Sequence, residues 1–339
     1  MNSFGRILRV QLFGESHGGR LGAIVDGLPA GLELGPEDLI PALERRRPGR
    51  AGTSRRREAD APAIVSGLFE GRTTGAPVLI QFENRDADPS AYREIARKPR
   101  PGHADLVARQ KFGGFNDPRG GGHFSGRLTL GLVAAGAIAR KLLPQVRIAA
   151  RATEAGGRAD VEAAVREAAR DGDSIGGIVE CVAEGLPAGL GEPFFDSVEG
   201  LLAHAVFAIP GIKGVEFGEG FGFGRARGQD VRDEITGADG RLRRNLSGGV
   251  DGGITSGNPL VFRVAVKPAV SFGELKTVDL ETGRPARLQM EGRHDPCIAL
   301  RVPVVLESVT ALVLADLMLL EGRLPRVLGE KRGEARRTK

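Results

Sequence analysis

Residues 304–320 read VVLESVTALVLADLMLL, and apolar side chains occupy nearly every turn of the helix that this stretch predicts. Residues 128–143, LTLGLVAAGAIARKLL, form a second segment of the same kind. A helix that is apolar almost all round needs burial on all sides. We therefore expect both helices to lie in the interior, between two β-sheets. Neither stretch contains eighteen uninterrupted apolar residues, so we do not interpret them as membrane spans.

Outward from these helices, the chain repeats one order of turns and strands. The hexapeptide GLPAGL at residues 27–32 recurs at 185–190, each time after an Ile-Val pair that predicts a strand. In each copy a helix-like segment, a Pro-Gly turn, a Thr-containing turn and a strand then follow in that order. In the first copy they lie at 39–46, 48–49, 73–77 and 78–82. In the second copy they lie at 198–208, 210–211, 255–259 and 260–266. Turn residues also recur by chance in chains rich in Gly and Pro, so coincidence is the alternative to a true repeat.

This order predicts an α+β fold, in which two mostly antiparallel sheets sandwich the helices within a single large domain, residues 1–325. We interpret the domain as internally duplicated (a β-α-β sandwich), with pseudo-repeats at about 1–150 and 160–325. Residues 155–171 predict an amphipathic surface helix that joins the halves. Residues 326–339 predict a polar, disordered tail.

Composition favours a protein that binds a small anionic ligand. Glycine accounts for 51 of the 339 residues, which indicates many tight turns and close approaches of the backbone to a ligand. The net charge is +5, and arginines gather in runs such as 45–47, 55–57 and 243–244. Such runs are typical of nucleic-acid patches, but arginine also binds carboxylate and phosphate through two parallel hydrogen bonds. Because Trp is absent and Tyr92 is the only Tyr, a stacking surface for nucleic acid is disfavoured.

The two cysteines, Cys181 and Cys297, provide neither a disulfide framework nor the spacing of a metal site, so we expect no bound metal. The N-terminus lacks an apolar segment with a basic lead. We therefore expect a soluble, cytoplasmic protein that binds neither membranes nor nucleic acid.

Three of the five histidines lie in small, charge-rich turns: FGESHG at 13–18, RPGHAD at 100–105 and GRHDPC at 292–297. An imidazole in such a turn can transfer a proton at neutral pH. The grouping indicates a site that moves protons on an anionic ligand. His204, by contrast, lies in an apolar helical segment, and we interpret it as a packed or surface residue.

These motifs, in this order, resemble the chorismate synthase family over about residues 4–320. The family also typically shows RRRPG, here 45–49, and an RGGG segment with a following Ser-x-Arg, here 119–127. The resemblance implies a sandwich fold and a homotetramer. It implies conversion of 5-enolpyruvylshikimate-3-phosphate to chorismate and phosphate, a redox-neutral 1,4-elimination that needs reduced FMN and is the last common step of aromatic amino-acid biosynthesis. NADPH would be needed only if the enzyme reduces its own flavin; otherwise a separate flavin reductase is the expected partner.

The resemblance also implies residue roles. His17 would protonate the leaving phosphate, His103 would stabilise the anionic reduced flavin on its N1 side, and Asp295, with Ser16, would assist proton removal through flavin N5. The substrate carries two carboxylates and a phosphate, and the residues that would bind it are Arg46, Arg100, Ser125, Arg127 and Arg293. The residues that would contact FMN are His123, Phe124, Ser125, Pro210, Gly211, Gly252, Lys267, Pro268, Ala269, Val270, Ser271 and Arg293.

The chain departs from the commonest family pattern at several positions. His123 replaces a frequent Arg, Gly126 a frequent Ala, and Asp251 a usual apolar residue. Gly52 occupies the position of a family arginine, whose role falls to Arg50, Arg55 or Arg56. Two other classes remain as alternatives: an RNA-binding protein that uses the arginine runs, and an ordinary flavin oxidoreductase with a nicotinamide site.

Overall fold

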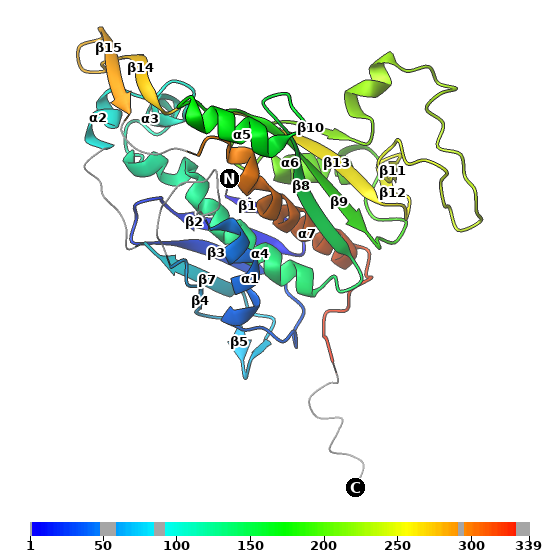
Figure 1. The fold of residues 1–339 in the computed structure, drawn as a ribbon. Helices are drawn as coiled ribbons and strands as arrows, with labels where there is room; N and C mark the ends of the chain where they lie inside the picture. Colours follow the sequence, from blue (N-terminus) through cyan, green and yellow to red (C-terminus); the bar gives the residue numbers. More distant parts are fainter. Residues whose placement is uncertain (1, 48–58, 85–91, 291–294, 330–339) are drawn as a thin grey trace.

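Two antiparallel sheets enclose a central layer of helices (Figure 1). The computed structural model describes residues 2–47, 59–84, 92–290 and 295–329. The helices are α1 (Ile40–Arg46), α2 (Tyr92–Arg97), α3 (Asp105–Lys111), α4 (Thr129–Lys141), α5 (Val161–Arg170), α6 (Val198–Val206) and α7 (Val302–Leu320). The strands are β1 (Ser3–Phe4), β2 (Arg9–Gly14), β3 (Arg20–Asp26), β4 (Ala63–Ile64), β5 (Leu68–Phe69), β6 (Arg72–Thr73), β7 (Val78–Glu83), β8 (Arg147–Ala155), β9 (Gly177–Glu184), β10 (Ile212–Phe217), β11 (Val250–Asp251), β12 (Ile254–Thr255), β13 (Leu260–Val266), β14 (Gly273–Val278) and β15 (Pro285–Met290).

Each large sheet belongs to one half of the chain. The first has the strand order β1-β2-β3-β7-β4 and the second β10-β13-β9-β8, with every neighbouring pair antiparallel. Strand β13 alternates buried and half-buried residues along its whole length, the period-two pattern of a sheet with one face on a core. The predicted α+β sandwich is therefore confirmed.

The central layer consists mainly of α4 and α7, which pack against each other between the sheets (Figure 1). Residues 129–139 of α4 and 304–319 of α7 are all buried, as their apolar sequences predict. Two acids in α7 are also buried, because each has strong partners. Glu307 binds Arg45, Arg140 and the backbone N–H of Ala150. Asp316 accepts hydrogen bonds from three successive backbone N–H groups, those of residues 6–8.

The two central helices approach each other most closely where small residues face each other. A Cβ atom at Gly136 of α4 would lie only 2.3 Å from the Cβ of Ser308 in α7. Any side chain larger than hydrogen at residue 136 would therefore push the helices apart.

The hexapeptide repeat has the same hydrogen bonds in both halves. Thr73 Oγ1 donates to Pro29 O and accepts from Leu32 N, at 2.6 and 2.9 Å. Thr255 Oγ1 makes the corresponding bonds to Pro187 O and from Leu190 N, at 2.8 and 2.9 Å. The strand register agrees too: Val25 pairs with Val78, and Ala183 pairs with Leu260. Val25 and Ala183 each lie two residues before the GLPAGL hexapeptide of their half. These equivalences support the prediction of an internal duplication.

Two predicted boundaries need correction. Strand β8 pairs with β9, so the second half of the fold begins near Arg147 and not at 160. The fold also extends past residue 325, because Ala30 N donates to Arg326 O and Leu328 N donates to Ala30 O. The rest of the predicted tail, 330–339, lies outside the described residues. Helix α5 covers most of the predicted surface helix and packs against β8.

In the described part of the chain, the helical stretch Ile298–Leu320 is long and apolar enough to cross a membrane. However, 94% of its most apolar window is buried inside the protein. A core helix passes the same test of length and composition, and the packing of α7 between the sheets identifies it as one.

Candidate active site

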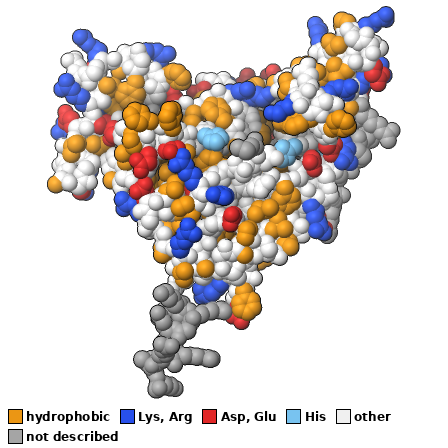
Figure 2. All heavy atoms as spheres, turned by 180° about the vertical axis from the view of Figure 1, so that it is seen from behind, with side chains coloured by type: hydrophobic (Ala, Val, Ile, Leu, Met, Phe, Trp, Pro, Cys, Tyr) orange, Lys and Arg blue, Asp and Glu red, His pale blue; other side chains and the backbone are white. Residues whose placement is uncertain are grey.

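A cavity of about 1010 Å³ lies where the N-terminal ends of α4 and α7 meet. Its remaining walls come from the N-terminal strand β1, the C-terminal part of α6 and loops at residues 100–105, 120–126 and 267–271. Both halves of the fold therefore contribute to one site. Figure 2 shows the reverse face of the molecule, where pale-blue histidine side chains are exposed below a saddle between two projecting parts. Histidines 103, 123 and 204 line the cavity.

Positive charge exceeds negative charge around the cavity. The described cationic side chains that line it are Arg46, Arg100, Arg127, Lys213, Lys267 and Arg301. The described acidic side chains that line it are Asp60, Asp105 and Asp295. With neutral histidines, these six cations and three anions give the lining a formal charge of +3. Such a cavity attracts ligands that carry several negative charges.

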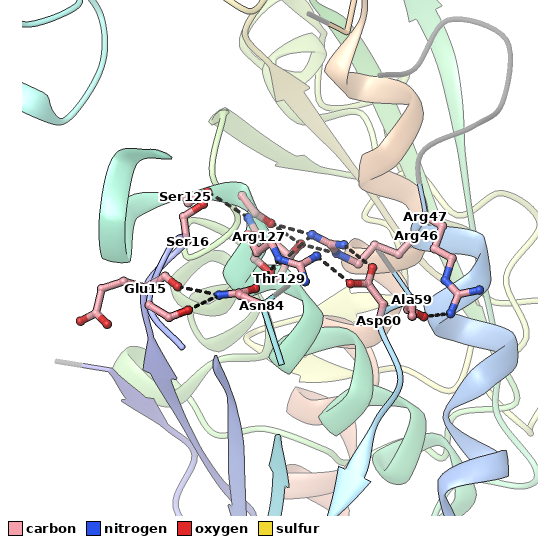
Figure 3. A network of polar contacts seen from close by, with 12 residues as sticks. Glu15, Ser16, Arg46, Arg47, Ala59, Asp60, Asn84, Ser125, Arg127 and Thr129 are labelled. Carbon is pink, nitrogen blue, oxygen red and sulfur yellow. Dashed lines mark hydrogen bonds and ion pairs between the residues drawn. The ribbon is translucent and has the colours of Figure 1, made fainter. Parts of the chain in front are cut away.

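Two of the predicted substrate arginines share one buried carboxylate (Figure 3). Arg127 Nη1 donates to Asp60 Oδ1 at 2.6 Å, and Arg46 Nη1 lies 3.7 Å from Asp60 Oδ2. Arg46 also donates to Thr129 Oγ1, and Arg127 donates to Asn84 Oδ1. The three charged side chains are at most 5% exposed. The two arginines and the one carboxylate together carry a net charge of +1.

His17 lies in the turn after β2 and packs beneath Gly120 of the cavity wall. Ser16 N donates to Gly122 O, and Asn84 Nδ2 donates to the carbonyls of Glu15 and Gly18, which fixes the turn. A Cβ atom at Gly120 would come within 2.3 Å of His17 Nδ1. Glycine at this position therefore lets the imidazole lie directly against the wall.

Ser16 and Ser125 meet next to His17. The two hydroxyl oxygens are 3.2 Å apart, and Ser125 Oγ also caps the following turn by accepting from Arg127 N. The structure thus brings together His17, Ser16, Ser125 and Arg127 from segments more than a hundred residues apart. Of these four, Ser125 and Arg127 line the cavity, whereas His17 and Ser16 do not.

Arg100 and His103 occupy the loop at residues 100–105, which also lines the cavity. Arg100 forms two parallel hydrogen bonds with Asp105, each 2.8 Å long. Burial opposes ionisation of Asp105, but the hydrogen bonds and charge of Arg100 outweigh it, so the pKa of Asp105 is lowered. His103 Nε2 is hydrogen-bonded to Ser271 Oγ, which links this loop to residues 267–271.

The predicted cofactor residues lie around the same cavity. His123 is held through Nδ1 by Gly14 O and through Nε2 by Asn2 Oδ1, both at 2.9 Å. Lys267 N donates to Gly211 O, and Lys267 Nζ donates to Gly102 O at 2.6 Å. Burial lowers the pKa of Lys267, and the charge of Lys213 lowers it further. The lining residues that match the prediction are His123, Phe124, Ser125, Pro210, Gly211, Lys267, Pro268, Ala269, Val270 and Ser271.

Asp295 also lines the cavity, is 9% exposed and accepts a hydrogen bond from Arg301 Nη1 at 3.1 Å. Gly252 does not line it. It lies in the turn between β11 and β12, where φ is +60° and a Cβ atom would meet nothing within 4 Å, and its contact with FMN stays a prediction. The predictions for Arg293 and for the replacement arginine, Arg50, Arg55 or Arg56, lie outside the described residues.

The sequence did not indicate several residues of the site. Asp60 and Asn84 hold arginines but belong to no recognisable motif. Arg301 directly precedes α7, much as Arg127 precedes α4, so the internal repeat could have indicated Arg301 as the counterpart of Arg127. His204 is a surface residue, one of our two interpretations, but it also lines the cavity and stacks edge-on against Phe4.

Comparison with known proteins agrees with this arrangement. A family model described as chorismate synthase matches residues 8–319. The chorismate synthase of Chitinophaga pinensis is 57% identical over 329 residues, covering 96% of this chain and 99% of that relative. The chorismate synthase of Aeropyrum pernix is 48% identical and covers 96% of this chain and 94% of that relative. A crystal structure of chorismate synthase matches with a TM-score of 0.72 and 27% identity, covering 94% of this chain and 93% of the other.

The match favours the enzyme over the RNA-binding protein and the ordinary flavin oxidoreductase. The chain belongs to the chorismate synthase family and is a lyase that converts 5-enolpyruvylshikimate-3-phosphate to chorismate and phosphate.

Proposed function

We propose that this chain carries out the elimination with reduced FMN, and that cofactor and substrate share the single cavity described above. The observation that carries the proposal is a volume of about 1010 Å³ combined with a surplus of cationic side chains. Pockets for one small ligand usually measure about 300–1,000 Å³. This cavity lies at the upper end of that range, and we propose that cofactor and substrate fill it together. Both ligands are phosphate esters, which suits the charge of the lining.

One group of lining residues fits a flavin. Residues 123–125, 210–211 and 267–271 combine an aromatic ring, small backbone turns and the cation of Lys267. Reduced FMN, when bound there, would lend electron density to the substrate as phosphate leaves and recover it as the hydrogen departs. His103, fixed by Ser271, would place its imidazole beside the anionic ring.

A second group of lining residues, which shares Ser125 with the first, fits the substrate. Arg46, Arg100 and Arg127 would bind its carboxylates and phosphate through planar forks, with Ser125 as an additional hydrogen-bond donor. His17, which lies directly behind Gly120 and does not itself line the cavity, would protonate the departing phosphate as a general acid, as the family resemblance implies. Asp295, with Ser16, would take part in the removal of the proton.

We further propose that the chain is a cytoplasmic homotetramer, supplied with reduced flavin by a separate reductase or by its own use of NADPH. Support for assembly comes from large apolar side chains on the surface, with Phe115, Phe194 and Phe195 each at least 89% exposed. Light scattering should give four times the chain mass of 35.8 kDa. A monomer mass would contradict the proposed assembly.

The decisive experiment measures phosphate release under anaerobic conditions. One equivalent of reduced FMN should support many turnovers while its absorbance spectrum stays that of the reduced form, because loss of phosphate and a proton leaves the redox balance unchanged. Oxidised FMN is the matched control and should support none. Stoichiometric oxidation of the flavin, or turnover without flavin, would refute the cofactor role.

A further inference from the structure

Asp60 is a buried acid that lines the cavity among the proposed substrate-binding residues. It lies three residues before β4, and it is 3% exposed. Its φ of +46° is a left-handed conformation that few residues other than glycine adopt. This bend directs the carboxylate into the protein, although a free aspartate would be more stable in water.

Both carboxylate oxygens of Asp60 face arginines that line the cavity. Oδ1 accepts from Arg127 Nη1 at 2.6 Å, and Oδ2 lies 3.7 Å from Arg46 Nη1 (Figure 3). The acid therefore lies between the two guanidinium groups and sets their relative position.

Neutral acceptors hold the same arginines from other directions. Arg46 Nε donates to Thr129 Oγ1 at 2.8 Å, and Arg46 Nη2 donates to Gly126 O at 3.0 Å. Arg127 Nε donates to Asn84 Oδ1 at 3.0 Å. Long flexible side chains are thus fixed by oxygens from several segments, which lowers the entropy that ligand binding would otherwise cost.

The charges explain why a single acid suits this place. Two buried guanidinium groups without a counter-charge would repel each other and resist burial. Two acids would cancel the positive charge and leave nothing to attract an anion. One acid keeps the pair buried and ordered, and these three side chains together carry a net charge of +1.

We infer that Asp60 is a positioning residue for the elimination, holding Arg46 and Arg127 in the geometry that binds a carboxylate or phosphate of the substrate. The inference rests on the proposed placement of the substrate against these two arginines. Asp60 itself does not react.

The structure offers a matched control. Glu307 is also a buried acid shared by two arginines, Arg45 and Arg140, but it does not line the cavity, and these arginines are 43% and 37% exposed on their side chains. Glu307→Gln therefore disturbs a similar ion cluster away from the substrate.

The test compares Asp60→Asn with Glu307→Gln by titration of 5-enolpyruvylshikimate-3-phosphate and by KM and kcat at saturating reduced FMN. Attraction between charges alone predicts that Asp60→Asn binds the anion more tightly, because the cluster gains a positive charge. Loss of positioning predicts the opposite, with Kd and KM rising by about 10–100-fold, as when residues that orient a binding group are removed. Glu307→Gln should leave both constants unchanged.

Three results would overturn the inference. One is a folded Asp60→Asn protein that binds the substrate as well as, or better than, the parent. Another is an equal loss of affinity in Glu307→Gln, which would indicate general destabilisation. If Asp60→Asn does not fold, Asp60→Glu keeps the charge but displaces the carboxylate by one methylene group, and unchanged affinity in that variant would be the third.

Two further variants separate this inference from the proposed substrate site. Arg46→Lys and Arg127→Lys keep the charge and lose the fork. If both bind the substrate as the parent does, the substrate placement itself is wrong. If both bind weakly and Asp60→Asn does not, only the role of Asp60 is wrong.

Discussion

At the scale of single residues, the site depends on backbone conformations that most side chains avoid. Gly120, Gly121 and Gly122 have φ values of +60°, +80° and +54°, and this turn forms the wall over His17. Asp60 shares the left-handed region without being glycine. The positions of the catalytic groups are thus set by turns, and a change at a turn residue should affect chemistry that the residue does not perform.

Gly120→Ala tests this dependence. We expect turnover to fall by about 10²-fold or more, because the new methyl group would displace His17, and general acids contribute about 10²–10⁴-fold. The measurement is kcat with reduced FMN supplied. Gly114→Ala is the control, since Gly114 has a φ of +84° but no atom within 4 Å of its Cβ position. It should bear the same backbone strain and retain turnover; a comparable loss in both would show that strain alone is responsible.

Asp105 predicts a pH dependence of stability. Its pKa in the folded protein lies below the ordinary value of 3.8, so the ionised form stabilises the fold at higher pH. That contribution is complete above the unfolded pKa and is lost as the pH falls through the folded one. Urea unfolding between about pH 5 and pH 2 should show a smaller decline for Asp105→Asn than for the parent. Asp251→Asn, at an exposed position, should keep the parent's decline, and identical curves for all three proteins would contradict the assignment.

At the scale of elements, the two halves repeat their hydrogen bonds as well as their order. The Thr of each Thr-containing turn closes the preceding GLPAGL loop through both a donated and an accepted bond. Gly75 and Gly257, two residues later, have φ values of +89° and +87°. The same local solution thus connects a strand, a loop and the next strand in each sheet.

Thr73→Val and Thr255→Val should therefore destabilise the protein by similar amounts. Each change leaves one buried N–H and one buried carbonyl without the hydroxyl, and such a loss costs about 1–3 kcal/mol. Thr74→Val, at an exposed position, is the control and should change the free energy of unfolding little. A large effect in one half and none in the other would count against the equivalence of the repeats.

The elements were predictable where their sequence pattern is strong. The apolar runs of α4 and α7 and the repeated turns predicted the sandwich fold. They are informative because few residue types are suited to a fully buried helix or to a turn with a positive φ. The start of the second half was misplaced because β8 has no repeated turn before it. The close of the fold at Arg326 and Leu328 depends on backbone hydrogen bonds, to which side-chain identity contributes almost nothing.

At the scale of the whole molecule, the cavity collects residues from Asn2 to Leu312. The sequence identified most of its charged groups by their types and by family resemblance. It did not identify Asp60, Asn84 or Lys213, because their roles arise only from which segments the fold brings together.

The close contact of Gly136 with Ser308 also affects the dimensions of the site. The two helices that touch there directly follow Arg127 and Arg301, which both line the cavity, whereas Gly136 does not. The spacing of the two helices, and with it that of the two arginines, therefore depends on residue 136 having no side chain. We expect a larger residue there to change the dimensions of the cavity, and so the ligands that it admits, without contacting them.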